Sequence, residues 1–193
     1  MLSENIDNLN SVCDYFIRWG IRIININTVD KISPNNTNGI GVNENALMKI
    51  IKRCSEGYKP TNLFTILLSH HGPKDLGYDG QTDLPWATMK NFLEETGVKL
   101  WLSGHRHQLN KSEIEVGDED NPIKIYHACT GSLRLSTKAL PEKGKRGFNR
   151  IELIRTTGKV TKIILFPTKM ENLSNEVKHV WNLDEQTKSS ELS

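Results

Sequence analysis

Four of the six histidines in this 193-residue chain stand in two pairs. His70 with His71, and His105 with His107, each follow a short apolar run of the kind found in buried strands. Neutral imidazole nitrogen is a common ligand for zinc, iron and similar ions. Open α/β sheets bind ligands just outside the carboxyl ends of their strands. The two pairs therefore predict a metal site at an edge where two strands end.

The spacing of the second pair suits a shared target. Residues two apart in an extended chain point to the same side, so His105 and His107 can direct their imidazoles at one site. Gly104 lets the chain turn sharply where the strand ends. Between the two histidines, Arg106 has a fork-shaped guanidinium that can bind a phosphate oxygen, although a solvent-facing arginine explains it equally well.

Strand-like and helix-like segments alternate in the first half of the chain, and strands follow. We expect strands over 20–27, 63–68 and 98–102, with helices that begin after Asn43 and at Pro85 and stop at Gly57 and Gly97. Short strands are then expected over 113–116, 123–127, 148–154 and 160–166. Parallel crossovers followed by antiparallel pairing predict an α/β fold with mixed β-sheets and flanking helices. Residues 168–193 are expected to form a polar, partly disordered tail, with a short amphipathic helix near 173–181 as an option.

Composition excludes several functional classes. Twenty-five lysines and arginines against 23 acidic residues leave a net charge of +2, without the concentrated excess expected of a nucleic-acid surface. No apolar run approaches the roughly 18 residues of a membrane helix. The three cysteines are odd in number and show no C-x-x-C spacing, which argues against a disulfide framework and favours a reducing cytoplasm.

The segments around the histidines, ILLSHHGP (66–73) and LWLSGHRHQ (100–108), resemble the closing motifs of the calcineurin-like metallophosphoesterases. Those motifs are a strand-end histidine, often written HH-P, and a later G-H-x-H. A strand that ends in Asn27 and Thr28, the T-G-S segment 130–132 and a terminal β-hairpin extend the likeness over about residues 16–166. The resemblance implies a four-layer α/β sandwich with a two-metal site that hydrolyses phosphoesters.

Carried over residue by residue, the resemblance also implies a set of site residues. His70 would be a metal ligand as the first histidine at its strand end, and His105 and His107 would bind the two different ions. His71 would lie behind the ions or at the rim of the site and, with Arg106, face the substrate. The two divalent ions would be manganese, iron or zinc. A phosphorylated small molecule or a nucleotide would be the substrate.

Other polar residues near the predicted site have less decisive interpretations. His127 lies in an expected strand without a partner motif, and His179 lies in the tail, so both are interpreted as structural. Asp79 and Asp83 could add oxygen ligands, but a turn residue and a helix-cap neighbour explain them better. Lys74 and the loop after it could form a lip that faces the substrate.

Three further motifs of that family, D-x-H, G-D-x-x-D and G-N-H-D/E, do not occur in this chain. The nearest approach, 117–121, comes too late in the chain and has Asn121 where an aspartate is required. Two-metal hydrolysis needs a carboxylate between the ions, which three neutral imidazoles do not replace. Residues 1–167 are therefore interpreted as the C-terminal portion of such a domain, truncated and inactive or nearly so alone. A missing N-terminal half or a second subunit would supply the remaining ligands.

Two other interpretations stay open. The chain could be a degenerate, non-catalytic relative that keeps the sheet as an interaction scaffold, with the histidines as relics or as a weak single-metal site. It could also be a plain helix–sheet protein in which the paired histidines are coincidental. Robust hydrolysis of a phosphoester by the purified chain would exclude both.

Overall fold

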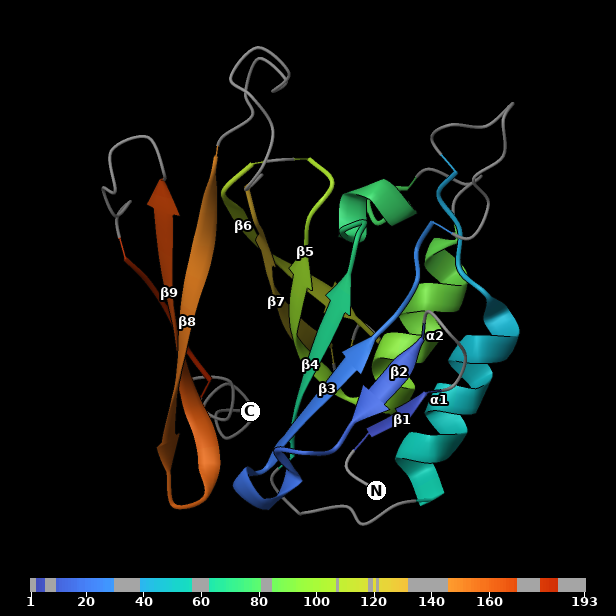
Figure 1. Ribbon diagram of the computed structural model, residues 1–193, viewed down its shortest axis with the longest axis horizontal. Helices are drawn as coiled ribbons and strands as arrows, with labels where there is room; N and C mark the ends of the chain where they lie inside the picture. Colours follow the sequence, from blue (N-terminus) through green and yellow to red (C-terminus); the bar gives the residue numbers. More distant parts are fainter. Residues whose placement is uncertain are drawn as a thin grey trace.

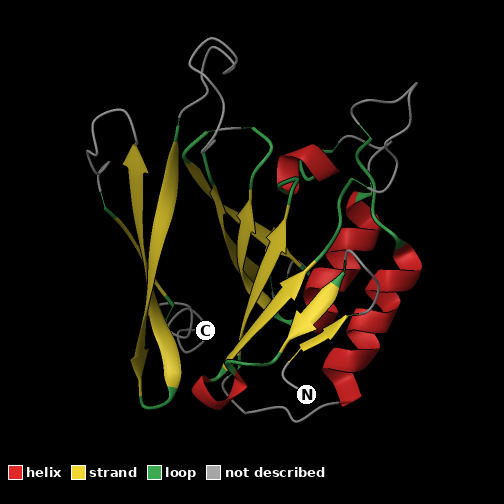
Figure 2. Cartoon of the chain, in the orientation of Figure 1, coloured by secondary structure: helices red, strands yellow, loops and turns green. Residues whose placement is uncertain are grey.

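The computed structural model describes residues 3–5, 10–29, 39–56, 63–80, 85–106, 108–117, 120, 122–131, 146–169 and 178–183. These residues form a seven-stranded sheet, a three-stranded sheet and two α-helices (Figure 1, Figure 2). The large sheet stands between the helices and the small sheet, so the described residues build three layers. The predicted ligand His107, the carboxylate Asp83 and the expected helix stop Gly57 lie outside the described residues.

Parallel pairing dominates the centre of the large sheet. Its strands lie in the order β1 (Ser3–Asn5), β2 (Ser11–Cys13), β3 (Ile21–Asn25), β4 (Phe64–Ser69), β5 (Val98–Ser103), β7 (Ile123–Cys129) and β6 (Asn110–Val116). Strands β3, β4, β5 and β7 run parallel, whereas β2 and β6 pair antiparallel with their inner neighbours. The carboxyl ends of the parallel strands therefore lie along one edge of the sheet.

Both α-helices cover the same face of the large sheet and begin where the sequence predicts. Before α1 (Glu44–Glu56), the side-chain Oδ1 of Asn43 accepts a hydrogen bond from the Ala46 N–H at 3.1 Å. The second helix, α2 (Trp86–Thr96), ends at Gly97, which takes a φ of 63° and donates its N–H to the last helical turn. Within the described part of the chain, no helix is both long and apolar enough to cross a membrane.

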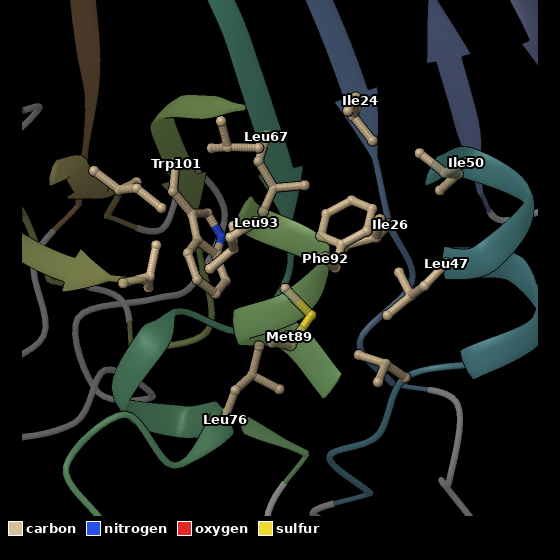
Figure 3. Packing of buried hydrophobic residues seen from close by; sticks show 14 of the residues in the cluster. Ile24, Ile26, Leu47, Ile50, Leu67, Leu76, Met89, Phe92, Leu93 and Trp101 are labelled. Carbon is tan, nitrogen blue, oxygen red and sulfur yellow. The ribbon is translucent and has the colours of Figure 1, made fainter. Parts of the chain in front are cut away.

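The first hydrophobic core lies between the large sheet and the helices (Figure 3). Its largest side chains, each at most 2% exposed, are Ile24, Leu67 and Trp101 from the strands and Leu47, Ile50, Met89, Phe92 and Leu93 from the helices. Full burial of one such side chain stabilises a fold by about 1.5–3 kcal/mol. This core therefore holds the parallel strands, and with them the segments that follow their ends.

A second core fills the space between the two sheets. The small sheet is an antiparallel meander of β8 (Gly147–Thr156), β9 (Lys159–Lys169) and β10 (His179–Asn182). Its inner face packs against the other face of the large sheet through Leu100, Tyr126, Ile163, Leu165 and Trp181, among others. The parallel strands are thus covered on both faces, as is usual for strands of this kind.

The predicted α/β architecture of mixed sheets with flanking helices is confirmed, and two local expectations are corrected. The polar sequence near 173–181 suggests a helix in a tail, but 179–182 form β10, and Trp181 is only 4% exposed in the second core. No strand was expected at β1 or β2, which have three residues each. Strands this short carry little periodic signal, and they form because a neighbouring strand offers backbone partners.

A buried ion pair ties the amino-terminal side of β3 to α1. Arg22 is 2% exposed, and its Nε donates to Asp14 Oδ1 at 2.8 Å. The other carboxylate oxygen of Asp14 accepts from Arg53 of α1 at 3.1 Å. Removal of one partner of a buried pair leaves the other charge without compensation, which destabilises strongly.

We expect Asp14→Asn to lower the free energy of unfolding by about 3 kcal/mol, because the buried guanidinium of Arg22 loses its counter-charge. Urea unfolding followed by circular dichroism measures the change. The matched control is Glu56→Gln, which removes a carboxylate from an exposed ion pair with Lys52. That pair should contribute less than about 0.5 kcal/mol. Equal losses in the two variants would contradict a special role for Asp14.

Candidate metal centre

Two parallel strands bring the histidine segments together. β4 and β5 pair with Ser69 opposite Ser103, so the chain leaves the sheet at the same level in both places. Just beyond, the Gly104 N–H donates a hydrogen bond to the carbonyl oxygen of His70 at 3.0 Å. The described histidines of both pairs therefore meet at the carboxyl edge of the sheet, where their positions in the sequence predict a site.

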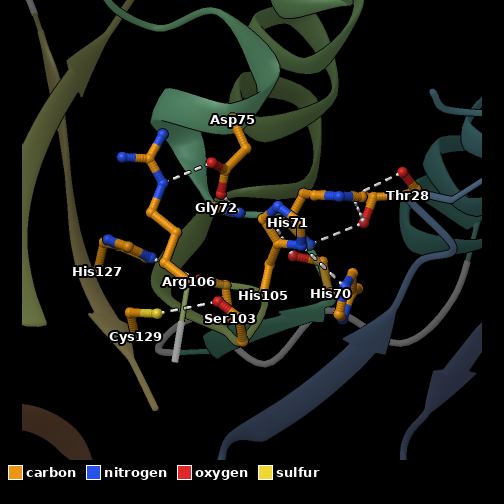
Figure 4. Close-up of polar contacts among 12 residues, drawn as sticks. Thr28, His70, His71, Gly72, Asp75, Ser103, His105, Arg106, His127 and Cys129 are labelled. Atoms are coloured by element: carbon orange, nitrogen blue, oxygen red, sulfur yellow. Dashed lines mark hydrogen bonds and ion pairs between the residues drawn. The ribbon is translucent and has the colours of Figure 1, made fainter. Parts of the chain in front are cut away.

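Three imidazoles cluster at this edge (Figure 4). The candidate ligand nitrogens of His70, His71 and His105 all lie within 4.8 Å of one another. His105 Nδ1 and His70 Nε2 are 3.2 Å apart. Two nitrogens bound at about 2.0–2.1 Å to one tetrahedral ion stand about 3.3 Å apart. This pair therefore has the separation that a shared ion requires.

The surroundings of His71 select one tautomer of its ring. His71 Nδ1 lies 2.8 Å from the carbonyl oxygen of Thr28, and because a carbonyl only accepts, Nδ1 carries the proton. The lone pair is then on Nε2, the arrangement usual for a metal-binding histidine. Burial lowers the pKa of His71, and the neighbouring His105 lowers it further, so the ring is neutral near pH 7. His71 is 3% exposed and lies inside the cluster, not at the rim.

His105 is held in a strained turn. The Arg106 N–H donates to the Gly104 carbonyl at 2.8 Å, which closes a three-residue turn around His105. The φ of His105 is 62°, a left-handed value that costs a residue with a side chain about 1–2 kcal/mol. The extended backbone expected over 105–107 is therefore wrong at His105. Strain of this kind persists only where the surroundings hold it, and it clusters at functional sites.

Buried polar side chains support both histidine segments. Trp101 Nε1 donates to Ser69 Oγ at 2.7 Å, and that hydroxyl donates to the His71 carbonyl at 2.7 Å. On the other segment, the Cys129 thiol donates to the Gly104 carbonyl at 3.0 Å. Burial raises the pKa of Cys129, so the sulfur is a protonated donor and not a thiolate ligand.

Arg106 points away from the histidines. Its Nε donates to Asp75 Oδ1 at 2.6 Å, and Asp75 Oδ2 accepts the Gly72 N–H at 3.0 Å. Asp75 belongs to the 3₁₀ helix η2 (Pro73–Leu76), whose N-cap Gly72 follows His71. No role is predicted for Asp75 from the sequence; its carboxylate accepts the N–H of the N-cap residue, as an acidic side chain at the third helical position can do. Asp79, by contrast, is exposed and outside the cluster.

His127 is a further residue whose place was not foreseen. It lies in β7, only 9% exposed, with Nε2 2.8 Å from Ser103 Oγ and Nδ1 3.0 Å from Ser112 Oγ. Burial lowers its pKa to about 4. A Cβ placed on Gly72 would lie 3.0 Å from His127 Nε2, so this ring packs directly behind the turn that carries the first histidine pair. No sequence motif around His127 predicts this position. It results from the parallel pairing of β7 with β5, which places His127 opposite Trp101.

The donor set fits one ion better than two. Three histidine side chains without a carboxylate resemble the three-histidine sites that hold catalytic zinc. Among the described residues, no carboxylate joins the cluster. The bridging oxygen that a two-ion site needs is therefore not found in this part of the chain. The cluster contains His70 and His105, which the sequence predicts as ligands, and also His71.

The chain was compared with family models, with known sequences and with solved structures. No family model matches the chain. Purple acid phosphatase 17 of Arabidopsis thaliana is 33% identical over 67 residues, which are 35% of this chain and 19% of that protein. The solved structure of the purple acid phosphatase PPD1 from yellow lupin seeds aligns with a TM-score of 0.50 at 12% identity, over 84% of this chain and 31% of the lupin chain.

A second solved structure aligns equally well. GAP50, the anchor in the inner membrane complex of Plasmodium, has a TM-score of 0.50 at 19% identity, over 84% of this chain and 49% of that one. The fold is metallophosphoesterase-like. The chain spans less than half the length of each of these proteins. At such identities the alignments establish the fold, and function must be argued from the site.

The strain at His105 can be tested by replacing it with glycine or alanine. Both variants lose the imidazole, but only glycine adopts a φ of 62° without strain. We expect His105→Gly to be more stable to urea than His105→Ala by about 1 kcal/mol. Equal stability of the two variants would mean that the turn is not strained.

The buried state of His127 should appear in the pH dependence of stability. The ring titrates near pH 6.5 when unfolded and at about 4 when folded. As the pH falls through this window the unfolded state binds a proton that the folded state does not, so the chain should lose up to about 3 kcal/mol of stability. Urea unfolding at pH 7, 5.5 and 4 measures the loss. The His127→Asn variant should lack this component, and parallel curves for the two proteins would contradict it.

Proposed function

We propose that this chain provides the histidine ligands of a metal-dependent phosphoester hydrolase. The observation that carries the proposal is the convergence of His70, His71 and His105 at the ends of two neighbouring parallel strands. The metallophosphoesterase-like fold and the partial identity with a purple acid phosphatase support it. The substrate would be a phosphorylated small molecule or a nucleotide, as a monoester or a diester. The three free cysteines support a reducing, cytoplasmic location.

A divalent ion such as manganese, iron or zinc would act as a Lewis acid on a phosphoryl oxygen. The histidine side chains are already oriented for such an ion by hydrogen bonds within the chain. Thr28 holds the proton of His71 on Nδ1, and burial keeps that ring neutral. The turn around His105 directs its Nδ1 toward His70. Little reorganisation would then be needed when an ion arrives, which favours tight and well-oriented binding.

A second ion would need ligands beyond this cluster. In our proposal His107 binds that ion, as the family resemblance implies. The bridging carboxylate would come from a segment outside the described residues, from an N-terminal half of the domain or from a second subunit. Arg106 is engaged with Asp75 and would contact substrate only on the side away from the histidines.

A non-catalytic scaffold is the second candidate. Its support is the lack of a carboxylate in the cluster among the described residues, since such a group is what two-ion hydrolysis requires. GAP50, the anchor in the inner membrane complex of Plasmodium, has a similar fold, which supports a role of this kind. In this reading the three histidines bind one ion without turnover.

We expect the purified chain, freed of metal by a chelator, to bind zinc or manganese at the histidine cluster. Competition with a chromophoric chelator measures the affinity, and elemental analysis gives the number of ions per chain. His70→Ala and His105→Ala should each weaken binding about 100-fold or more, since loss of an outer-sphere partner alone weakens binding about 10–100-fold. The control His179→Ala changes a histidine of β10 and should bind as the parent does. Unchanged affinity in the first two variants would refute the ligand assignment.

Turnover separates the two candidate functions. The metal-loaded chain is assayed with p-nitrophenyl phosphate and with bis(p-nitrophenyl) phosphate, which report monoester and diester hydrolysis. Activity that disappears in His105→Ala supports the hydrolase and refutes the scaffold. Metal binding without hydrolysis of either compound supports the scaffold, or a hydrolase that requires a further chain.

A further inference from the structure

A pocket opens beside the histidine cluster, and its lining does not include His70, His71 or His105. It encloses about 150 Å³ between η2, the loop after β5, and strands β6 and β7. Ser103, Ser112 and His127 line the pocket with polar groups. The pKa of His127 is lowered to about 4, so its ring is neutral above about pH 4. Figure 4 shows Arg106 and Asp75 between His127 and the histidine cluster.

Two walls of the pocket are formed by residues that follow the clustered histidines directly in the sequence. The residue after His71 is Gly72, and 72–75 form one wall. The residue after His105 is Arg106, which forms the neighbouring wall. A ligand in the pocket would therefore lie against the same two turns that carry the histidines. Binding in the pocket and at the cluster can thus belong to one molecule.

Positive charge exceeds negative charge around the pocket. Among the described residues, its lining includes the cations Lys74, Arg106 and Lys111 and a single carboxylate, Asp75. That carboxylate is already paired with Arg106 Nε and the Gly72 N–H. The terminal nitrogens of Arg106 have no acceptor among the described residues, and its side chain is 48% exposed. The pocket thus offers a surplus of donors and of positive charge, which suits an anion.

The size and lining of the pocket limit the ligand. Pockets for drug-sized molecules enclose about 300–1,000 Å³, and this one is smaller. In the part of the chain that the structure describes, its lining contains no phenylalanine, tyrosine or tryptophan on which a nucleobase could stack. A compact hydrophilic anion such as a phosphate group meets both limits, and its oxygens would accept from the lysine and arginine donors. Neutral His127 accepts the proton of one of the two neighbouring serine hydroxyls, which leaves the other hydroxyl as a further donor.

We infer that this pocket binds a second phosphate group of the substrate, while the phosphoester to be cleaved lies at the histidine cluster. The inference rests on the proposed function and specifies its substrate class, a small molecule that carries two phosphate groups. Arg106 then serves the distal phosphate and not the reacting one. Lys74 and Lys111 stand at the edge of the pocket, and the Lys111 ammonium also contacts His179 Nδ1 of β10.

The test measures anion binding without any metal. The chain is stripped of metal by a chelator, the chelator is removed, and inorganic phosphate and pyrophosphate are titrated in by isothermal calorimetry. One site per chain is expected for each anion. In the double variant Lys74→Gln/Lys111→Gln, binding should be about tenfold weaker, since each exposed charge pair is worth up to about 1 kcal/mol.

Two matched variants locate the site. Lys52→Gln/Lys90→Gln removes the same number of charges from α1 and α2 and should bind phosphate as the parent does. His70→Ala/His105→Ala empties the histidine cluster and should also bind phosphate normally. Thermal unfolding confirms that each variant is folded.

The inference is overturned if the parent binds neither anion, if both lysine double variants weaken binding equally, or if the histidine double variant abolishes it. The last result would place the anion at the histidine cluster. Because no metal is present, anion binding in the pocket can succeed even where hydrolysis fails. If the pocket binds no anion, the metal titration and the turnover assay still test the proposed hydrolase.

Discussion

Parallel pairing of β4 and β5 in one register is the constraint on which the site depends. With Ser69 opposite Ser103, the two chains leave the sheet side by side, and the Gly104 N–H reaches the His70 carbonyl. Residues 35 apart in the sequence thereby place their imidazoles 3.2 Å apart at the nearest nitrogens. The core between helices and sheet holds this register because a shift of one residue would turn buried side chains such as Leu67 and Trp101 to the other face.

Around the cluster, buried polar groups do the positioning. Thr28 orients His71, the Trp101 indole holds Ser69, and the Cys129 thiol bonds the Gly104 carbonyl. Thr28, Trp101 and Cys129 are each at most 4% exposed, and an unmade hydrogen bond of a buried group costs about 1–3 kcal/mol. The histidine segments are therefore confined to few arrangements, and the left-handed turn at His105 can be maintained.

Charge divides the site into two regions with different chemistry. Among the described residues, the histidine cluster contains no carboxylate, so a bound cation would keep most of its charge. The adjoining pocket has three cations and one carboxylate that is already engaged. With a cation bound at the cluster, both regions would attract anions, which supports the proposal of a phosphorylated substrate bound across the Arg106 turn. This separation also explains why the guanidinium of Arg106 is turned away from the imidazoles: Asp75 is its nearest counter-charge.

The sequence alone was sufficient for the α/β class, both α-helices, the central strands and the meeting of His70, His71 and His105 at strand ends. Those features depend on local periodicity, capping residues such as Asn43 and the general rule for parallel sheets. It did not predict β10, the tautomer of His71, the turn at His105, or the places of Asp75 and His127. Each of these is decided by a partner far away in the chain: Trp181 is buried because the second sheet faces Tyr126, and His71 is oriented by Thr28, 43 residues earlier. Local pattern determines what a segment can form, whereas hydrogen-bond partners and burial exist only once the tertiary structure has brought distant residues together.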